Sequence, residues 1–66
     1  MTGIEALYIR RDQLTEDIKR LENMIRRYAI DREQSLLITA ANDLADCIDE
    51  RKLIMRQIIS HSRQVA

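Results

Sequence analysis

Proline is absent from this chain and glycine occurs once, at Gly3, so the residues that most often interrupt helices are almost missing. The aromatic residues are two tyrosines. A single cysteine excludes an internal disulfide, and one cysteine with one histidine is too few ligands for a typical structural zinc site. The remaining composition, rich in Ala, Leu, Ile, Glu, Arg and Gln, favours long helices over sheets.

The length of 66 residues, with 11 basic and 11 acidic side chains, allows at most one small domain. Such a domain buries a modest share of its surface, so without a disulfide or a metal we expect a second chain to complete the fold. Charges of mixed sign interrupt residues 1–20, and apolar runs such as residues 36–38 are short, so we expect no signal peptide and no membrane span. The lone thiol fits a reducing compartment, which indicates a cytoplasmic protein.

The first half of the chain carries a heptad pattern, with spacings that alternate between three and four residues. Its a and d positions are Ile4, Leu7, Arg11, Leu14, Ile18, Leu21, Ile25 and Tyr28. All except the arginine are apolar or aromatic, which is typical of a coiled-coil seam. Thr2 followed by Glu5 matches a capping box, so we predict a helix over about residues 3–30.

The second half carries a wider apolar stripe. We assign its d positions to Leu37, Leu44, Arg51, Ile58 and Val65, and its a positions to Ala41, Ile48, Met55 and Ser62. The flanking apolar residues are Ala40, Cys47 and Ile54 on one side and Ala45 and Ile59 on the other. A stripe this wide indicates a helix, over about residues 35–63, that touches more than one neighbour.

Residues 31–34 interrupt both patterns. The apolar pattern resumes at Leu37, two residues out of phase with the first seam, and a continuous coiled coil does not absorb that offset. Asp31, with Gln34 three residues later, is a good N-cap for the second helix. We therefore predict an all-α fold, an antiparallel two-helix hairpin of coiled-coil type spanning residues 1–66, completed to a helical bundle by a second chain. Because no glycine or proline marks the turn, one unbroken helix is the alternative.

Folding at this turn predicts where charged side chains meet. Lys19 would face Asp46 and Arg20 would lie near it, while Glu16 would lie near Lys52. Such pairs favour the antiparallel orientation, and the alternative for each pair is that its charges are solvated on the surface. Arg11 and Arg51 would meet in a polar layer within the core. They either set the register of the two helices or extend their guanidinium groups past the seam to water.

No set of residues has the spacing of a catalytic, metal or cofactor site. His61 stands alone, so no Ser-His-Asp set can form. Asp43, Asp46 and Glu50 share a helix face but lack the histidine that helical metal sites add. We therefore expect no enzyme activity and no cofactor. The basic residues of the first helix would be neutralised by the acidic residues of the second and have no aromatic platform, which argues against nucleic-acid binding.

Three partial resemblances bear on function. The opening MTGIEAL, the length and the two-helix layout resemble the small co-chaperones of bacterial type III secretion needle subunits, helical hairpins that help to keep the needle protein unpolymerised in the cytosol. Residues 40–46, AANDLAD, are similar to the signature of small sporulation-regulator phosphatases, with Leu44 at its leucine but Ala45 in place of its aspartate. The layout also resembles the plasmid RNA-regulator hairpin that dimerises into a four-helix bundle.

Taken with the apolar stripe, these features predict a non-enzymatic protein-interaction module, a chaperone- or adaptor-like hairpin. It would form a homodimer, or a heterodimer with a helical partner. The alternatives are a dimeric regulator that binds RNA or DNA and, third, an aspartyl-phosphate phosphatase. The predicted interface residues are Leu37, Ile38, Leu44, Ala45, Ile48, Ile54, Met55, Ile58 and Ile59.

Overall fold

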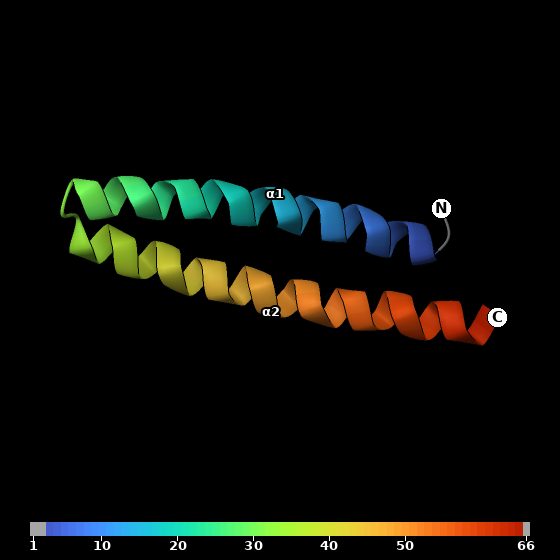
Figure 1. Ribbon diagram of the computed structural model, residues 1–66. Helices are drawn as coiled ribbons and strands as arrows, with labels where there is room; N and C mark the ends of the chain where they lie inside the picture. Colours follow the sequence, from blue (N-terminus) through green and yellow to red (C-terminus); the bar gives the residue numbers. More distant parts are fainter. Residues whose placement is uncertain (1–2, 66) are drawn as a thin grey trace.

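The computed structural model describes residues 3–65 as two helices joined by a short turn (Figure 1). Helix α1 spans Gly3–Ile30 and helix α2 spans Gln34–Val65. The helices run antiparallel and side by side, so the start of α1 and the end of α2 lie at the same end of the molecule (Figure 1). The predicted all-α hairpin is confirmed, and the alternative of one unbroken helix is wrong. The predicted cap Thr2 and the side chain of Val65 lie outside the described residues.

The end of α1 is a Schellman motif formed without glycine. The Glu33 N–H donates to the Tyr28 carbonyl oxygen at 2.9 Å, and the Arg32 N–H donates to the Ala29 carbonyl oxygen at 3.4 Å. Arg32 has a φ of 58°, in the left-handed region where helix C-termini usually place glycine. Arg32 therefore adopts the left-handed conformation that a glycine usually provides, and the turn forms without glycine or proline.

The predicted role of Asp31 as the N-cap of the second helix is wrong. The Asp31 N–H donates to the Arg27 carbonyl oxygen at 2.9 Å, which extends the hydrogen-bonding pattern of α1 to this residue. Glu33 is the residue directly before α2, and its carbonyl oxygen accepts a hydrogen bond from the Leu37 N–H at 2.9 Å. The chain thus reverses direction over residues 31–33, one residue shorter than the predicted turn.

The heptad seam predicted for the first helix is the face of α1 that contacts α2. Leu14, Ile18 and Leu21 are buried. The other five predicted positions are half-buried: Ile4, Leu7, Arg11, Ile25 and Tyr28. Leu14 is only 1% exposed and forms the core cluster with Ile54 and Ile58. Because burying one such side chain contributes about 1.5–3 kcal/mol, this cluster is a main source of the hairpin's stability.

The seam predicted for the second helix is correct in one column and wrong in the other. Leu37, Leu44 and Arg51 are half-buried and Ile58 is buried, as predicted. The second column that faces α1 consists of Ala40, Cys47 and Ile54. The column predicted in its place lies one residue further along the chain, which rotates it by about 100° around the helix and away from α1. Its members Ala41, Met55 and Ser62 are exposed, and Ile48 is half-buried.

The predicted ion pairs between the helices are also wrong. Lys19 pairs with Glu16 at 3.9 Å and Arg20 pairs with Asp17 at 3.0 Å, so both pairs lie within α1. Side chains three residues apart on one helix are already neighbours, whatever the position of the second helix. Across the residues that the structure describes, the ion pair between the helices joins Arg10 to Glu50 instead.

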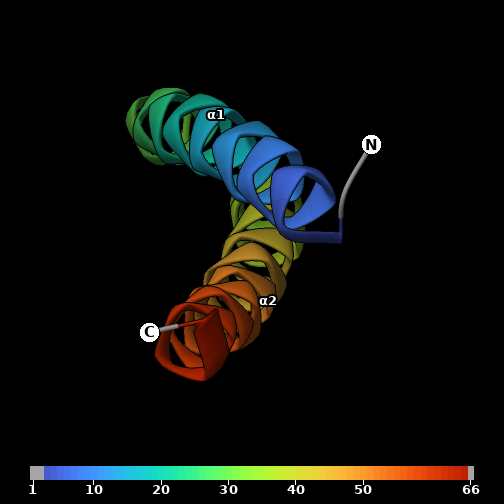
Figure 2. The same cartoon turned by 90° about the vertical axis from the view of Figure 1, so that its right-hand side faces the viewer.

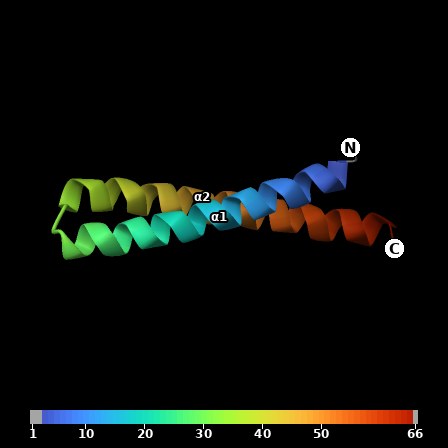
Figure 3. The same cartoon turned by 90° about the horizontal axis from the view of Figure 1, so that it is seen from above.

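The hairpin is long and thin. It measures 50 × 17 × 13 Å, with a radius of gyration of 15.2 Å, against about 11 Å for a compact domain of this length. Seen along its length, each helix contacts the other on one side (Figure 2), and the two helices cross in the view from above (Figure 3). The buried side chains in the described part of the chain are Leu14, Ile18, Leu21, Ala40, Ile54 and Ile58. Because 45% of the residues are hydrophobic and few of them are buried, much apolar surface stays in contact with water.

Neither α1 nor α2, over the residues described, is long and apolar enough to cross a membrane.

Candidate functional site

The predicted interface residues divide into two groups in the structure. Leu37, Leu44, Ile54 and Ile58 belong to the seam that α1 covers, so they hold the hairpin together. Ile38, Ala45, Met55 and Ile59 are exposed, and Ile48 lies half-buried between the two groups. The residues free to contact another molecule are therefore those of the second group.

The second group belongs to a continuous stripe along α2, which we call the outer stripe. Its positions alternate in spacing between three and four residues: Ile38, Ala41, Ala45, Ile48, Lys52, Met55, Ile59 and Ser62. Six of the eight are apolar, as in the seam of a coiled coil. The exposed fractions are 58% for Ile38, 40% for Met55 and 51% for Ile59. Helix α2 thus carries two seams about 100° apart, one filled by α1 and one open.

The other surface flanking the seam of α2 has a different character. It consists of Leu36, Thr39, Asp43, Asp46, Glu50, Leu53, Gln57 and Ser60. Only two leucines, 17 residues apart in number, interrupt its polar side chains. The apolar pattern is therefore restricted to one flank of α2.

Helix α1 has no second seam of this kind. On the flank nearest the outer stripe its side chains are mainly polar or charged, namely Glu5, Tyr8, Asp12, Thr15, Lys19, Glu22, Arg26 and Ala29. An additional helix packed there would remove charges from water without apolar contacts in return. The open seam therefore lies on α2 alone, and one further helix is enough to fill it.

An ion pair closes the opposite side of the hairpin. Arg10 Nε donates to Glu50 Oε2 at 2.7 Å, and both side chains remain 45% exposed. The hydrogen bond and the charge of Arg10 lower the pKa of Glu50, and the same hydrogen bond raises the pKa of Arg10. The two sides of the seam thus differ, with a polar contact on one side and open apolar surface on the other.

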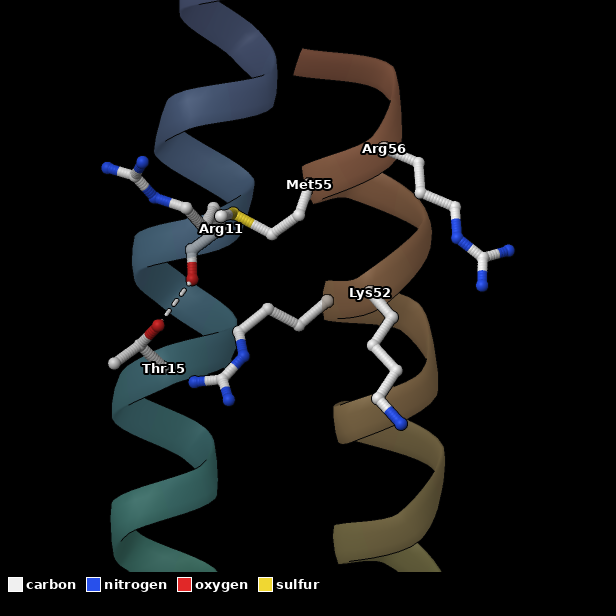
Figure 4. Close-up of a pocket in the computed structure, with 6 residues that line it drawn as sticks. Arg11, Thr15, Lys52, Met55 and Arg56 are labelled. Atoms are coloured by element: carbon white, nitrogen blue, oxygen red, sulfur yellow. Dashed lines mark hydrogen bonds between the residues drawn. The ribbon is translucent and has the colours of Figure 1, made fainter. Parts of the chain in front are cut away.

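A shallow depression joins the outer stripe to α1. It is lined by Arg11, Thr15, Arg51, Lys52, Met55 and Arg56 (Figure 4). The Met55 side chain extends across toward α1, whereas the Arg56 side chain points away from it (Figure 4). Met55 thus shares this depression with four cationic residues, Arg11, Arg51, Lys52 and Arg56. Within the described residues Arg51, Lys52 and Arg56 form no ion pair.

The two arginines predicted as a polar core layer both line this depression and are half-buried. The Arg11 guanidinium points away from α2 (Figure 4), pairs with Asp12 at 3.1 Å and lies 4.9 Å from the ring centroid of Tyr8. Among the described side chains no charged one is buried. This geometry corresponds to a side chain whose stem covers the seam while its charge stays in water.

The remaining chemically reactive groups are dispersed. Cys47 is half-buried against the core cluster, and His61 is exposed near the end of α2. The described residues contain no group of three His, Cys, Asp or Glu side chains that could hold a metal ion. In the segment resembling the phosphatase signature, Leu44 lies in the seam against α1 and Ala45 in the outer stripe.

Comparison with known proteins gives no further guide to function. No protein-family model matches the chain, and searches of curated proteins and of solved structures found no match.

Proposed function

We propose that the protein is a non-enzymatic interaction module whose outer stripe binds a helix of another chain. The observation that carries this proposal is the regular three-and-four spacing of apolar residues along nearly the whole of α2, on a flank that α1 leaves uncovered. Scattered exposed apolar residues are normal on protein surfaces, but a continuous patch with coiled-coil spacing is a typical binding surface.

The energetics support this role. Full burial of an isoleucine side chain is worth about 1.5–3 kcal/mol, and Ile38 and Ile59 each retain roughly half of their exposure. A helix laid in the outer stripe would therefore gain about 1 kcal/mol from each isoleucine, in addition to contacts with Met55 and Ile48. For a two-helix unit of 66 residues these contributions are large relative to the total stability.

The same geometry supports a proposed chaperone- or adaptor-like role. The outer stripe is a preformed apolar surface. A helix whose apolar residues alternate in spacing between three and four would pack against it. The proposal places the protein in the cytoplasm, where a thiol such as Cys47 stays reduced. The two-helix layout supports the comparison with the needle-subunit co-chaperones in architecture alone.

Site-specific photocrosslinking in the cells that make the protein tests this proposal. A diazirine analogue of leucine replaces Ile38 in the outer stripe or, as a matched control, Leu36 on the other flank, which is 48% exposed against 58% for Ile38. We expect a protein adduct from position 38 and none from position 36. Equal adducts from both positions, or none from position 38, would contradict the proposal.

A second candidate function, binding of a nucleic acid, is favoured by one observation. One depression is lined by four cationic residues, Arg11, Arg51, Lys52 and Arg56. Binding of a phosphate backbone there should weaken steeply with salt. Retention on heparin that falls between low and physiological salt, and that is lost in Lys52→Gln with Arg56→Gln, would support this candidate. Elution at low salt for both proteins would exclude it.

A further inference from the structure

We propose that the helix filling the outer stripe is α2 of a second copy of this chain, running antiparallel, with a two-fold axis beside Ile48. The inference rests on the proposed function, because it names the occupant of the same surface. It follows from three properties of α2: the symmetry of the stripe, the sizes of its side chains and the division of its charges.

The outer stripe is nearly symmetric about Ile48. Ile38 lies ten residues before Ile48 and Ile59 lies eleven residues after it, while Ala41 and Met55 each lie seven residues away. When two such helices run antiparallel, the residues before the centre of one face the residues after the centre of the other. Ile38 then faces Ile59 of the second copy, and the two Ile48 side chains meet at the axis.

Side-chain size favours the same orientation. In the antiparallel pair, Ala41 faces Met55 of the second copy and Ala45 faces its Lys52, so each long side chain meets a small one. Alternating small and large side chains is what allows helices to interdigitate at close distance. In a parallel pair, each of these residues would face its own copy, and the two Lys52 ammonium groups would meet in the seam.

The charges of α2 are divided between its two halves. The acidic residues of α2 are Asp43, Asp46, Asp49 and Glu50, all in residues 34–50, which contain no basic residue. The basic residues of α2 are Arg51, Lys52, Arg56 and Arg63, all in residues 51–65, which contain no acidic residue. About an axis beside Ile48, residues 34–47 carry two acidic and no basic side chains, and residues 49–65 carry two acidic and four basic ones. An antiparallel pair therefore sets halves of opposite net charge together, whereas a parallel pair sets halves of the same net charge together.

The local charges within the hairpin are consistent with this arrangement. Helix α1 satisfies Glu50 through Arg10, but it leaves Arg51, Lys52 and Arg56 without an ion pair in the described structure. In the antiparallel pair these cations lie at the level of residues 34–47 of the second α2, the half whose net charge is negative. The four helices then lie in the order α1, α2, α2 of the second copy and α1 of the second copy.

Thiol cross-linking in a Cys47→Ala background tests both the partner and its direction. Ile38→Cys and Ile59→Cys are made separately, one with a size tag, and mixed with a short bifunctional thiol reagent whose reach matches helices 8–10 Å apart. We expect a cross-linked product between the two variants and little product from either alone. Ile48→Cys alone should cross-link to itself. Circular dichroism checks that each variant is helical, and Cys47→Val replaces Cys47→Ala if the latter does not fold.

Leu36→Cys mixed with Leu53→Cys is the matched control, because these leucines are similarly exposed but lie on the other flank. Cross-linking of Ile38→Cys with itself would overturn the antiparallel direction. Absence of stripe-specific products, together with a monomer in sedimentation, would overturn the second copy as occupant. If photocrosslinking at position 38 then yields a different protein, the proposed function stands without this inference, and if it yields no adduct, both fall.

Discussion

Replacement of Arg32 by glycine should give a more stable hairpin than replacement of Arg32 by glutamine. A residue other than glycine in the left-handed region costs roughly 1–2 kcal/mol, and Arg32 has a φ of 58° there. Glycine removes this strain but gains freedom in the unfolded chain, which offsets about 0.5–1 kcal/mol. We therefore expect a net gain of about 0.5–1 kcal/mol from the change of backbone preference.

The substitution also removes a positive charge near the C-terminus of α1, where a cation stabilises the helix by about 0.3–1 kcal/mol. Arg32→Gln loses the same charge but keeps the left-handed strain, so it is the matched reference. The thermal midpoint of Arg32→Gly, followed by circular dichroism at 222 nm at fixed protein concentration, should exceed that of Arg32→Gln by about 2–8 °C. Arg32→Val should melt below both, because a β-branched residue is least tolerant of this conformation.

Equal midpoints for Arg32→Gly and Arg32→Gln would refute the reasoning. Such a result would mean that residue 32 does not adopt the left-handed conformation and that the chain turns elsewhere. A loss of stability in Arg32→Gly relative to Arg32→Gln would refute it more strongly, because flexibility would then be the dominant effect at this position.

Three further outcomes are expected. Leu14→Ala should cost about 2–5 kcal/mol in chemical denaturation because Leu14 is 1% exposed, whereas Ile30→Ala, at an 81% exposed site, should change stability by less than about 0.5 kcal/mol. Because Arg10 lowers the pKa of Glu50 below its ordinary 4.5, this pair should stabilise the fold above that pH and stop doing so as the pH falls through the lowered pKa. Thermal midpoints from pH 7 to pH 3 should therefore converge for wild type and Glu50→Gln, and a constant difference would contradict the linkage. Cys47 should react with a bulky maleimide more slowly in the native protein than in denaturant, and equal rates would show that it does not pack in the seam.

The face of α1 that forms the core could be predicted because one apolar stripe runs along this helix. Every position from Ile4 to Tyr28 in that heptad is buried or half-buried. With a single stripe, the period of the sequence fixes both the helix and the direction of its buried face.

The contact face of α2 could not be predicted in the same way, because two stripes run along this helix. Ala40 and Ile54 are buried by α1, while Ala41 and Met55, one residue further along, belong to the outer stripe. Both columns are apolar enough to form a seam, so only the position of α1 distinguishes them. The same ambiguity placed Leu37, Leu44, Ile54 and Ile58 in the predicted partner interface, although they hold the hairpin together.

The backbone conformation of the turn could not be predicted from the sequence, for a different reason. Its hydrogen bonds at Tyr28 and Ala29 are made by the backbone, which any residue can provide. Arg32 gives no local signal for a left-handed conformation, and Asp31 resembles an N-cap although its N–H belongs to the end of α1. The position of the reversal was nevertheless predictable, because the apolar pattern changes phase there.

Sedimentation equilibrium of two matched variants tests most directly whether the outer stripe is the surface on which the protein associates. Ile59→Glu alters the outer stripe and Leu53→Glu alters the other flank, at sites that are 51% and 56% exposed in the hairpin. In a two-fold dimer each substitution occurs twice, and the two half-exposed Ile59 side chains together lose about 2 kcal/mol of burial, or about 30-fold in Kd. Burial of two glutamate charges in the interface weakens association further. We predict that the wild-type protein and Leu53→Glu dimerise at micromolar concentration and that Ile59→Glu is monomeric there. Equal association of the two variants would contradict the account.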